Sequence, residues 1–132
     1  MSLYTVLPEQ VDELWPAIVT EIKRTDDDVT DSEDIKALVK KGTWQLWIYT
    51  EDSVIQLVAT TSFIYYGDKK MCRIETIAGR GREEYTRCLK DIEEWAKLNA
   101  CIGMDIFGRK GWEKVLKPFD YNFEAVLLRK YF

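Results

Sequence analysis

A strand that runs through two glycines into a helix is the feature that most constrains the fold of this chain. The segment "KMCRIETIA" (70–78) has the β-branched and apolar composition of a strand, and "GRGREEY" follows it directly. The next residues, 82–99, carry apolar side chains at helical spacing, and "CIGMDIF" (101–107) is a short, nearly all-apolar strand. A strand–helix–strand unit of this kind crosses over right-handed and sets its two strands parallel. The sequence therefore predicts a sheet that is parallel at this point.

The helix over 82–99 has one apolar stripe and an otherwise charged surface. The stripe residues recur every three or four positions, and they are Tyr85, Cys88, Leu89, Ile92, Trp95, Ala96 and Leu98. We expect this stripe to pack on the sheet, with Trp95 buried and structural.

The first half of the chain predicts two helices followed by two long strands. Residues 9–24 have helical periodicity, and Pro16 within them indicates either a bend or a new helix that starts there. The second helix carries Ile35, Leu38 and Val39 on one side; Thr30, Asp31 or Ser32 can cap it, and Gly42 ends it. "TWQLWIYT" (43–50) and "VIQLVATTSFIYY" (54–66) then read as an antiparallel hairpin.

The chain ends in a short helix through Trp112, Val115 and Leu116 and a closing strand, "NFEAVLLRKYF" (122–132). The predicted order is α-α-β-β-β-α-β-α-β, in one domain that spans residues 1–132. The fold class is α/β, with a mixed sheet that is antiparallel first and parallel at its third and fourth strands.

Composition excludes several kinds of site. The sequence contains no histidine, so a Ser-His-Asp triad, a Cys-His pair and ordinary His-ligated zinc are ruled out, and no metal is expected. The three cysteines, Cys72, Cys88 and Cys101, lie inside apolar segments without C-x-x-C spacing, which indicates buried free thiols. No apolar run is long enough for a membrane span, and the first residues do not resemble a secretory signal. We expect a cytoplasmic protein without a membrane partner.

The charge is distributed unevenly along the chain. Residues 1–68 hold five Lys or Arg and 13 Asp or Glu, a net charge of −8, whereas residues 69–132 hold 14 and 10, a net charge of +4. This positive excess in the second half is too weak for a nucleic-acid groove, but it suits a small anionic ligand.

The glycine junction lies in this basic half. A helix whose first backbone N–H groups are uncovered can bind an anion, and glycines before it let the backbone approach the anion closely. Arg80 and Arg82 add positive charge at this point. The alternative is that Gly79 and Gly81 only turn the chain from strand to helix.

These segments together resemble the GNAT acetyltransferase superfamily. The resemblance rests on the element order, on "TIAGRGREEY", "CLKDIEEWAKLNA" and "CIGMDIF", and on the final "GRKGWEKVLKPFDYNFEAVLLRKYF". More narrowly, the chain is similar to small phage-encoded members in which a helix ending in "ie-W-A" leads to a strand and then to "GR-GW". The resemblance implies the GNAT-like acyl-CoA N-acyltransferase fold and acetyl-CoA as the co-substrate.

The resemblance also implies where coenzyme A would bind. Its pyrophosphate would lie at the start of the 82–99 helix, contacted by Ile77, Ala78, Gly79, Arg80, Gly81 and Arg82. The pantetheine arm would lie between the strands before and after that helix, with Ile106, Phe107 and Gly108 along one side. Arg109 and Lys110, which follow, either reach the ligand or form only a solvated turn. Thr76 departs from the family pattern, because it stands where the family has Arg or Gln.

For catalysis, the resemblance implies Glu75 as the base, acting through water. The alternative is an ordinary exposed strand residue, and strict alternation would set Glu75 on one face with Arg73 and Ile77. The tyrosine that often serves as general acid in the family has no clear counterpart. The nearest candidates are Trp112, which has no useful acidity, and Tyr121, which comes too late.

The function implied is an acetyl-CoA-dependent N-acetyltransferase whose acceptor, a small amine or a protein amine, is unknown. The alternative is a catalytically degenerate GNAT-fold protein that serves as a phage virion or assembly component, or that contacts a host protein. Independently of this choice, the aromatic side chains of 43–66 that do not face the helices could floor an acceptor pocket or lie in a homo-oligomer interface, and core packing is the default for most of them.

Overall fold

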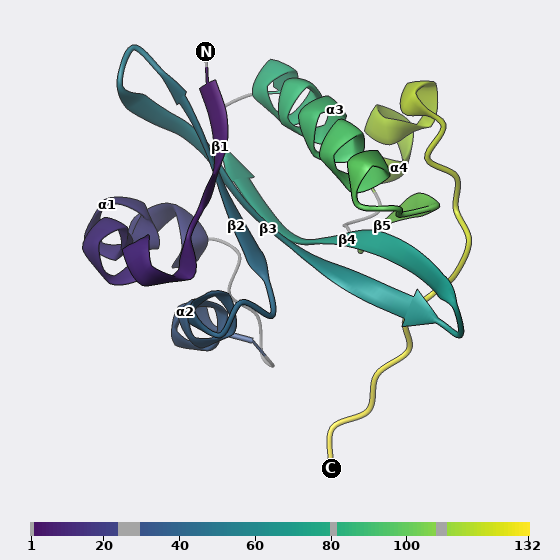
Figure 1. The fold of residues 1–132 in the computed structure, drawn as a ribbon. Helices are drawn as coiled ribbons and strands as arrows, with labels where there is room; N and C mark the ends of the chain where they lie inside the picture. Colours follow the sequence, from purple (N-terminus) through teal and green to yellow (C-terminus); the bar gives the residue numbers. More distant parts are fainter. Residues whose placement is uncertain (1, 24–29, 80–81, 108–110) are drawn as a thin grey trace.

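The computed structural model describes residues 2–23, 30–79, 82–107 and 111–132, and within them one five-stranded mixed sheet forms the centre of the molecule (Figure 1). The strands lie in the order of the sequence: β1 (Ser2–Val6), β2 (Gln45–Glu51), β3 (Val54–Tyr66), β4 (Lys69–Gly79) and β5 (Gly103–Ile106). The first four strands pair antiparallel, and β5 pairs with β4 in parallel. The predicted fold class and the parallel β-α-β unit are both confirmed.

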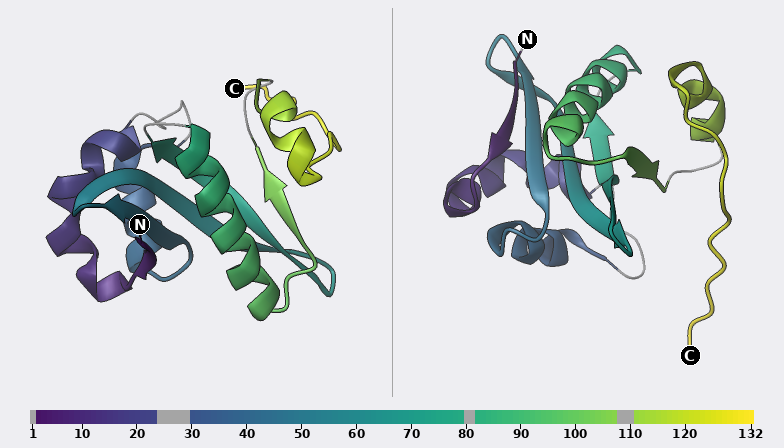
Figure 2. Two further views of the ribbon diagram at one scale, coloured as in Figure 1. Left: turned by 90° about the horizontal axis from the view of Figure 1, so that it is seen from above. Right: turned by 45° about the vertical axis from the view of Figure 1, so that its right-hand side comes forward.

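Helices cover both faces of the sheet. α1 (Val11–Lys23) and α2 (Ser32–Lys40) lie on one face, whereas α3 (Arg82–Leu98) and α4 (Gly111–Leu116) lie on the other (Figure 2). Short 3₁₀ turns, Pro8–Gln10 and Lys117–Phe119, precede α1 and follow α4. We call the two sides of the sheet the α1 face and the α3 face.

Each face has its own hydrophobic core because side chains along a strand alternate between the two faces. On β2, Leu46 and Ile48 belong to the core under α1 and α2, whereas Trp47 and Tyr49 belong to the core under α3. The central strands are therefore buried on both sides.

The structure resolves two alternatives that the sequence left open. α1 runs from Val11 to Lys23 as one helix with Pro16 inside it, so no second helix starts there. Asp31 is the N-cap of α2: its carboxylate accepts a hydrogen bond from the Asp34 N–H at 3.0 Å, and the Asp34 carboxylate accepts one from the Asp31 N–H at 3.1 Å. This reciprocal arrangement satisfies two N–H groups that the helix itself leaves unpaired.

The predicted element order is wrong at both ends of the chain. The structure begins with β1, which pairs with β2 in the register Tyr4↔Ile48, and the sequence analysis did not identify this strand. Conversely, residues 122–132, which were predicted to form a closing strand, form no helix or strand. A five-residue strand before the first helix carries little local signal, and a tail with strand propensity forms no strand without a partner.

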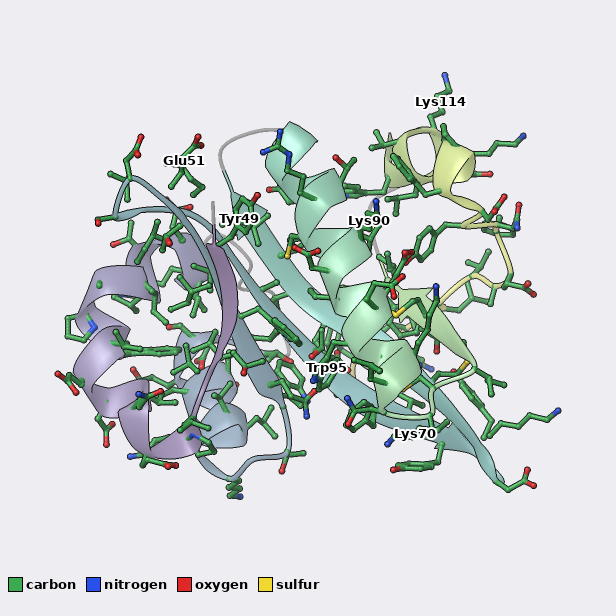
Figure 3. The ribbon with its side chains drawn as sticks, turned by 45° about the horizontal axis from the view of Figure 1, so that its top comes forward. Tyr49, Glu51, Lys70, Lys90, Trp95 and Lys114 are labelled. Carbon is green, nitrogen blue, oxygen red and sulfur yellow. The ribbon has the colours of Figure 1, made fainter. Side chains whose placement is uncertain are left out.

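The stripe on α3 also differs in part from the prediction. Cys88, Leu89, Ile92 and Ala96 are buried, but Trp95 is only half-buried and the Leu98 side chain is 87% exposed. Trp95 lies between α3 and the sheet (Figure 3), with its ring centroid 4.9 Å from that of Trp47. The helix therefore contacts the sheet through a narrower stripe than its composition suggested.

Candidate functional site

The two strands of the parallel unit separate halfway along β4. They pair from Met71↔Gly103 to Ile74↔Ile106, and β5 ends there while β4 continues to Gly79. Within the described residues, no strand pairs with that edge of β4 beyond Ile74. This leaves a length of strand edge where an extended, amide-containing ligand can add its own hydrogen bonds.

A β-bulge marks the same point. β3 and β4 pair Thr60 with Thr76 but Thr61 with Ile74, so Glu75 is the extra residue and has no cross-strand partner. A bulge breaks the alternation of side chains and redirects the strand. As a result Ile74 and Ile77 both pack in the core of the α3 face, and Ile77 does not share a face with Arg73 and Glu75, as alternation had predicted.

The Glu75 side chain lies on the α1 face, where it is half-buried. Its Oε1 accepts a hydrogen bond from Ser62 Oγ at 2.7 Å, and the Ser62 side chain is almost fully buried. Thr76, the next residue, is hydrogen-bonded through its hydroxyl to Thr60 at 2.6 Å. The bulge therefore presents a carboxylate beside the open edge of β4, on the face that carries α1 and α2.

A second cluster of polar side chains lies on the same face, around Arg73, two residues before Glu75 on β4. Arg73 Nη2 lies 3.3 Å from Asp105 Oδ2 and donates to Tyr66 Oη at 3.1 Å, and the Tyr66 hydroxyl donates to Asp105 at 2.9 Å. The guanidinium also lies over the Phe107 ring, with 4.4 Å between its central carbon and the ring centroid. These contacts tie the end of β5 to β4 just before the two strands part.

The sequence-predicted cofactor residues are placed as follows. Ala78 is buried, Ile77 and Gly79 are half-buried, and Phe107 is 58% exposed at the end of β5. Arg80, Gly81 and Arg109, and the side chain of Arg82, lie outside the described residues. Glu75, Ile77 and Gly79 thus lie along the unpaired part of β4, and Phe107 follows the strand that leaves it.

Gly79 has a packing reason to lack a side chain. A Cβ at this position would lie 3.0 Å from the Gln56 carbonyl oxygen and 3.1 Å from the Leu57 Cβ, both on the neighbouring strand β3. This close approach accounts for the glycine without any ligand, so Gly79 is weak support for a phosphate site.

Tyr85 is a residue of this region that sequence reasoning assigned only to the core. Its hydroxyl accepts a hydrogen bond from the Gly79 N–H at 2.9 Å, and its ring meets Trp112 edge-on at 5.0 Å between centroids. The side chain thus joins the end of β4, the first turns of α3, and α4. A tyrosine in place of an aliphatic residue on an apolar stripe was the available signal, because a buried hydroxyl requires a partner.

The two candidates for a general acid are not placed for that role. Burial raises the pKa of Tyr121, and the hydrogen bond from its hydroxyl to Glu93, at 2.9 Å, raises it further. A phenol held this firmly in its neutral form is a poor proton donor. Trp112 packs against Tyr85 between α3 and α4.

The described residues contain no group of three or more His, Cys, Asp or Glu side chains that could hold a metal ion. No helix in these ranges is both long and apolar enough to cross a bilayer.

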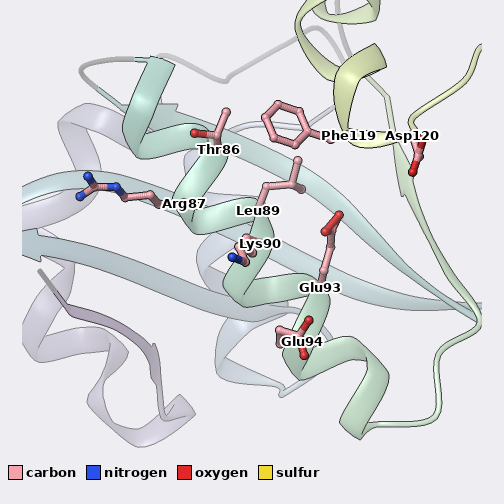
Figure 4. A pocket seen from close by; sticks show the side chains of 8 residues that line it. All are labelled: Thr86, Arg87, Leu89, Lys90, Glu93, Glu94, Phe119 and Asp120. Carbon is pink, nitrogen blue, oxygen red and sulfur yellow. The ribbon is translucent and has the colours of Figure 1, made fainter.

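A hollow of about 460 Å³ lies beside α3, between that helix and the turn after α4 (Figure 4). Both charge signs line it, with Arg87 and Lys90 opposed by Glu93, Glu94 and Asp120. It opens on the α3 face, away from the face that holds Glu75, so it is separate from the site at the bulge.

No protein-family model matches the chain, and no curated protein matches it. Solved structures do match over nearly the full length. A predicted acetyltransferase from Clostridium acetobutylicum, solved with acetyl-CoA, is 14% identical, with a TM-score of 0.72 over 98% of this chain and 95% of that one. Glucosamine-6-phosphate N-acetyltransferase from Arabidopsis thaliana is 10% identical, with a TM-score of 0.72 over 99% and 97%.

A third match is ribosomal-protein-alanine N-acetyltransferase from Brucella melitensis biovar Abortus 2308, with 8% identity and a TM-score of 0.69 over 98% of this chain and 100% of that one. The proteins from Arabidopsis and Brucella act on different acceptors by name, and the identities of all three proteins to this chain are too low to transfer a substrate. What they share with it is the path of the whole chain. The protein therefore has the GNAT acetyltransferase fold.

Proposed function

We propose that the protein is an N-acetyltransferase that transfers the acetyl group of acetyl-CoA to a primary amine. The observation that carries the proposal is the position of Glu75, a half-buried carboxylate on the bulge where β4 and β5 separate. A fold shared with acetyltransferases over the whole chain, one of them solved with acetyl-CoA, supports the same conclusion. Most primary amines are protonated at neutral pH, so the reaction needs a base at such a place.

Acetyl-CoA would bind along the open edge of β4. The Gly79 N–H points away from β3, toward Tyr85, and the Ile77 N–H, two residues earlier, points to the same edge. Because the Gly79 N–H already donates to the Tyr85 hydroxyl, we assign the Ile77 N–H to the extended, amide-containing arm or to the carbonyl oxygen that it would polarise. The pyrophosphate would lie at the start of α3, where the N–H groups of the first turn and the charges of Arg80 and Arg82, next to it in the sequence, favour an anion.

In the proposed reaction, Glu75 accepts one proton from the acceptor ammonium, directly or through water. The freed nitrogen lone pair attacks the acetyl carbonyl carbon, the carbon–sulfur bond breaks, and the thiolate leaves with the electron pair of that bond and takes up a proton. The products are an acetamide and CoA. Among the described residues we assign no general acid, so the second proton, which the nitrogen loses as the acetamide forms, would pass to the thiolate through water.

A second candidate is a non-catalytic use of the fold, as a phage particle component or a protein that contacts a host partner. Two observations favour it: packing against β3 explains Gly79, and Thr76, at the position where the family has Arg or Gln, is hydrogen-bonded to Thr60. Both weaken the case for a dedicated cofactor site.

One set of measurements separates the two candidates. Calorimetry tests acetyl-CoA binding, and release of the CoA thiol in the presence of a panel of polyamines, amino sugars and peptides tests turnover. We expect binding, amine-dependent thiol release, and a loss of about 10²- to 10⁴-fold in kcat for Glu75→Gln with nearly unchanged CoA affinity. Glu51→Gln, at an exposed strand carboxylate at the end of β2, is the matched control and should leave kcat unchanged.

Absence of CoA binding would overturn the proposal. Binding without turnover over the whole panel would favour the second candidate. Full turnover in Glu75→Gln would remove Glu75 as the base while leaving the acetyltransferase assignment in place.

A further inference from the structure

We propose that Ser62 is a positioning residue for Glu75: its hydroxyl holds one carboxylate oxygen so that the other faces the acceptor amine or its bridging water. This inference rests on the proposed function, because it concerns the base of that reaction. It adds a residue on β3, Ser62, that the sequence alone did not single out.

The contact between the two side chains is short and has a defined direction. Ser62 Oγ lies 2.7 Å from Glu75 Oε1. An ionised carboxylate only accepts hydrogen bonds, so the serine donates, and a hydroxyl bond to a charged oxygen is stronger than one between neutral groups. The bond engages Oε1, and Oε2 is the oxygen we assign to proton transfer.

Ser62 is itself firmly placed. Its side chain is 4% exposed, and the residue lies within the regular part of β3, opposite Arg73 of β4. A buried hydroxyl on a central strand has few orientations available and must find a partner. Glu75 is that partner, so the hydroxyl serves as a fixed point for a longer and more flexible side chain.

Glu75 needs such a fixed point because of the bulge. As the extra residue it lacks a cross-strand neighbour, and its three side-chain torsions are not set by the pleat of the sheet. The polar groups nearest in the strands are already engaged: Thr76 with Thr60, and Arg73 with Asp105 and Tyr66. A carboxylate must be held close to its productive geometry to act as a base, and a displacement of about 1 Å can cost 10²-fold in rate.

The test is a comparison of kinetic parameters across four variants. For Ser62→Ala we expect kcat to fall by about tenfold or more, with KM for acetyl-CoA within about twofold of the unaltered protein, because the carboxylate is misplaced but the cofactor edge is intact. Ser62→Thr keeps the hydroxyl on a residue suited to strands and should restore most of kcat. The double variant Ser62→Ala/Glu75→Gln should be no slower than Glu75→Gln alone, since the serine acts only through the glutamate.

Thr61→Val is the matched control. Thr61 is the next residue on β3, is fully buried and uses its hydroxyl to accept from Trp47 Nε1 at 3.0 Å, but it lies on the α3 face. Its loss should lower the unfolding temperature and leave kcat unchanged, which separates a general loss of stability from a loss of positioning.

The outcomes distinguish this inference from the proposed function. Turnover that falls in Glu75→Gln but not in Ser62→Ala would overturn the role of Ser62 alone. A double variant much slower than Glu75→Gln would do the same, since the serine would then act independently. No acetyl transfer by the unaltered protein would overturn the proposed function, and this inference with it.

Discussion

A single inserted residue decides which side chains of β4 face which layer. Upstream of Glu75, Cys72 and Ile74 pack under α3, and strict alternation would then turn Ile77 to the opposite face. Because Glu75 is extra, Ile77 returns to the core under α3 while Glu75 and Thr76 lie on the α1 face, where they bond Ser62 and Thr60. The bulge thus keeps the core continuous and at the same time turns a carboxylate away from it.

The cysteines give a test of the core at the scale of single side chains. Burial raises the pKa of both Cys72 and Cys88 to about 12, and it raises the pKa of Cys101, which is only half-buried. Only the thiolate reacts with disulfide reagents, and at pH 8 a thiol with a pKa near 12 is about one part in 10⁴ ionised. We expect Cys101 to react first with a thiol reagent in the native protein, and all three cysteines to react after denaturation.

The sign of the pH effect follows from the same shifts. A thiol whose pKa is higher in the folded chain stabilises the fold below the pKa of the unfolded thiol, and this contribution is lost as the pH rises toward the folded value. The pKa of the unfolded thiol is about 8.5, so at pH 8 the fold keeps this contribution. Cys72 and Cys88 should therefore be modified slowly at that pH. Rapid labelling of two or more thiols under native conditions would contradict the burial of this core.

At the scale of elements, the packing of α3 agrees well with the prediction from the sequence. The buried stripe on this helix is narrower than predicted. The stripe over 85–96 faces the sheet, and Trp95 stacks on Phe63 at 5.2 Å between centroids and meets Trp47 edge-on. Leu98, two positions beyond the stripe, is exposed to solvent. Apolar periodicity shows which side of a helix is buried, but the last turn can leave the sheet before the pattern ends.

Two alanine substitutions on α3 test this boundary. Trp95→Ala removes both aromatic contacts and should lower the free energy of unfolding by about 3 kcal/mol, the low end for a large aromatic residue because Trp95 is half-buried. Leu98→Ala, at a side chain 87% exposed, should change it by less than about 0.5 kcal/mol. Urea denaturation measures both, and similar losses in the two variants would show that the stripe extends to Leu98.

The elements that sequence predicted and those it missed differ in a physical way. The β4–α3–β5 unit was predictable because its helix has a long period and its strands are apolar, so the local signal and the tertiary structure agree. The bulge was not, because an extra residue is set by the register with β3, a partner 13 or more positions away in the sequence. Ser62 was missed for the same reason: its role exists only once β3 and β4 are aligned.

The candidate site shows the same division. Glu75 was named from a resemblance, and the strand edge beside it follows from the predicted β-α-β unit. Tyr85 and Ser62 contribute through hydrogen bonds to Gly79 and Glu75, contacts that no spacing in the sequence indicates. Residue types could suggest the chemistry here. The residues that support Gly79 and Glu75 could be identified only from the three-dimensional register of the strands.

At the scale of the whole molecule, the two cores share one sheet, and the chain after Tyr121 leaves both. Tyr121 packs against the core of the α3 face and donates to Glu93, and the remaining residues extend away from the body (Figure 1). The large apolar side chains of this tail are mostly exposed: Phe123, Val126, Leu127, Leu128, Tyr131 and Phe132. Exposed apolar segments with strand propensity promote self-association.

Truncation tests whether this tail belongs to the folded unit. A chain that stops after Asn122 loses only residues that add nothing to either core, so its free energy of unfolding should stay within about 0.5 kcal/mol of the full chain, and light scattering should show less self-association. A chain that stops after Phe119 also loses Tyr121, with its half-buried ring and its bond to Glu93, and should be less stable by about 2 kcal/mol or more. An extended tail clear of the body has no contacts to lose. If the truncation after Asn122 lowers the free energy of unfolding by more than about 1 kcal/mol, residues 123–132 therefore pair with the sheet in solution, as the sequence predicted.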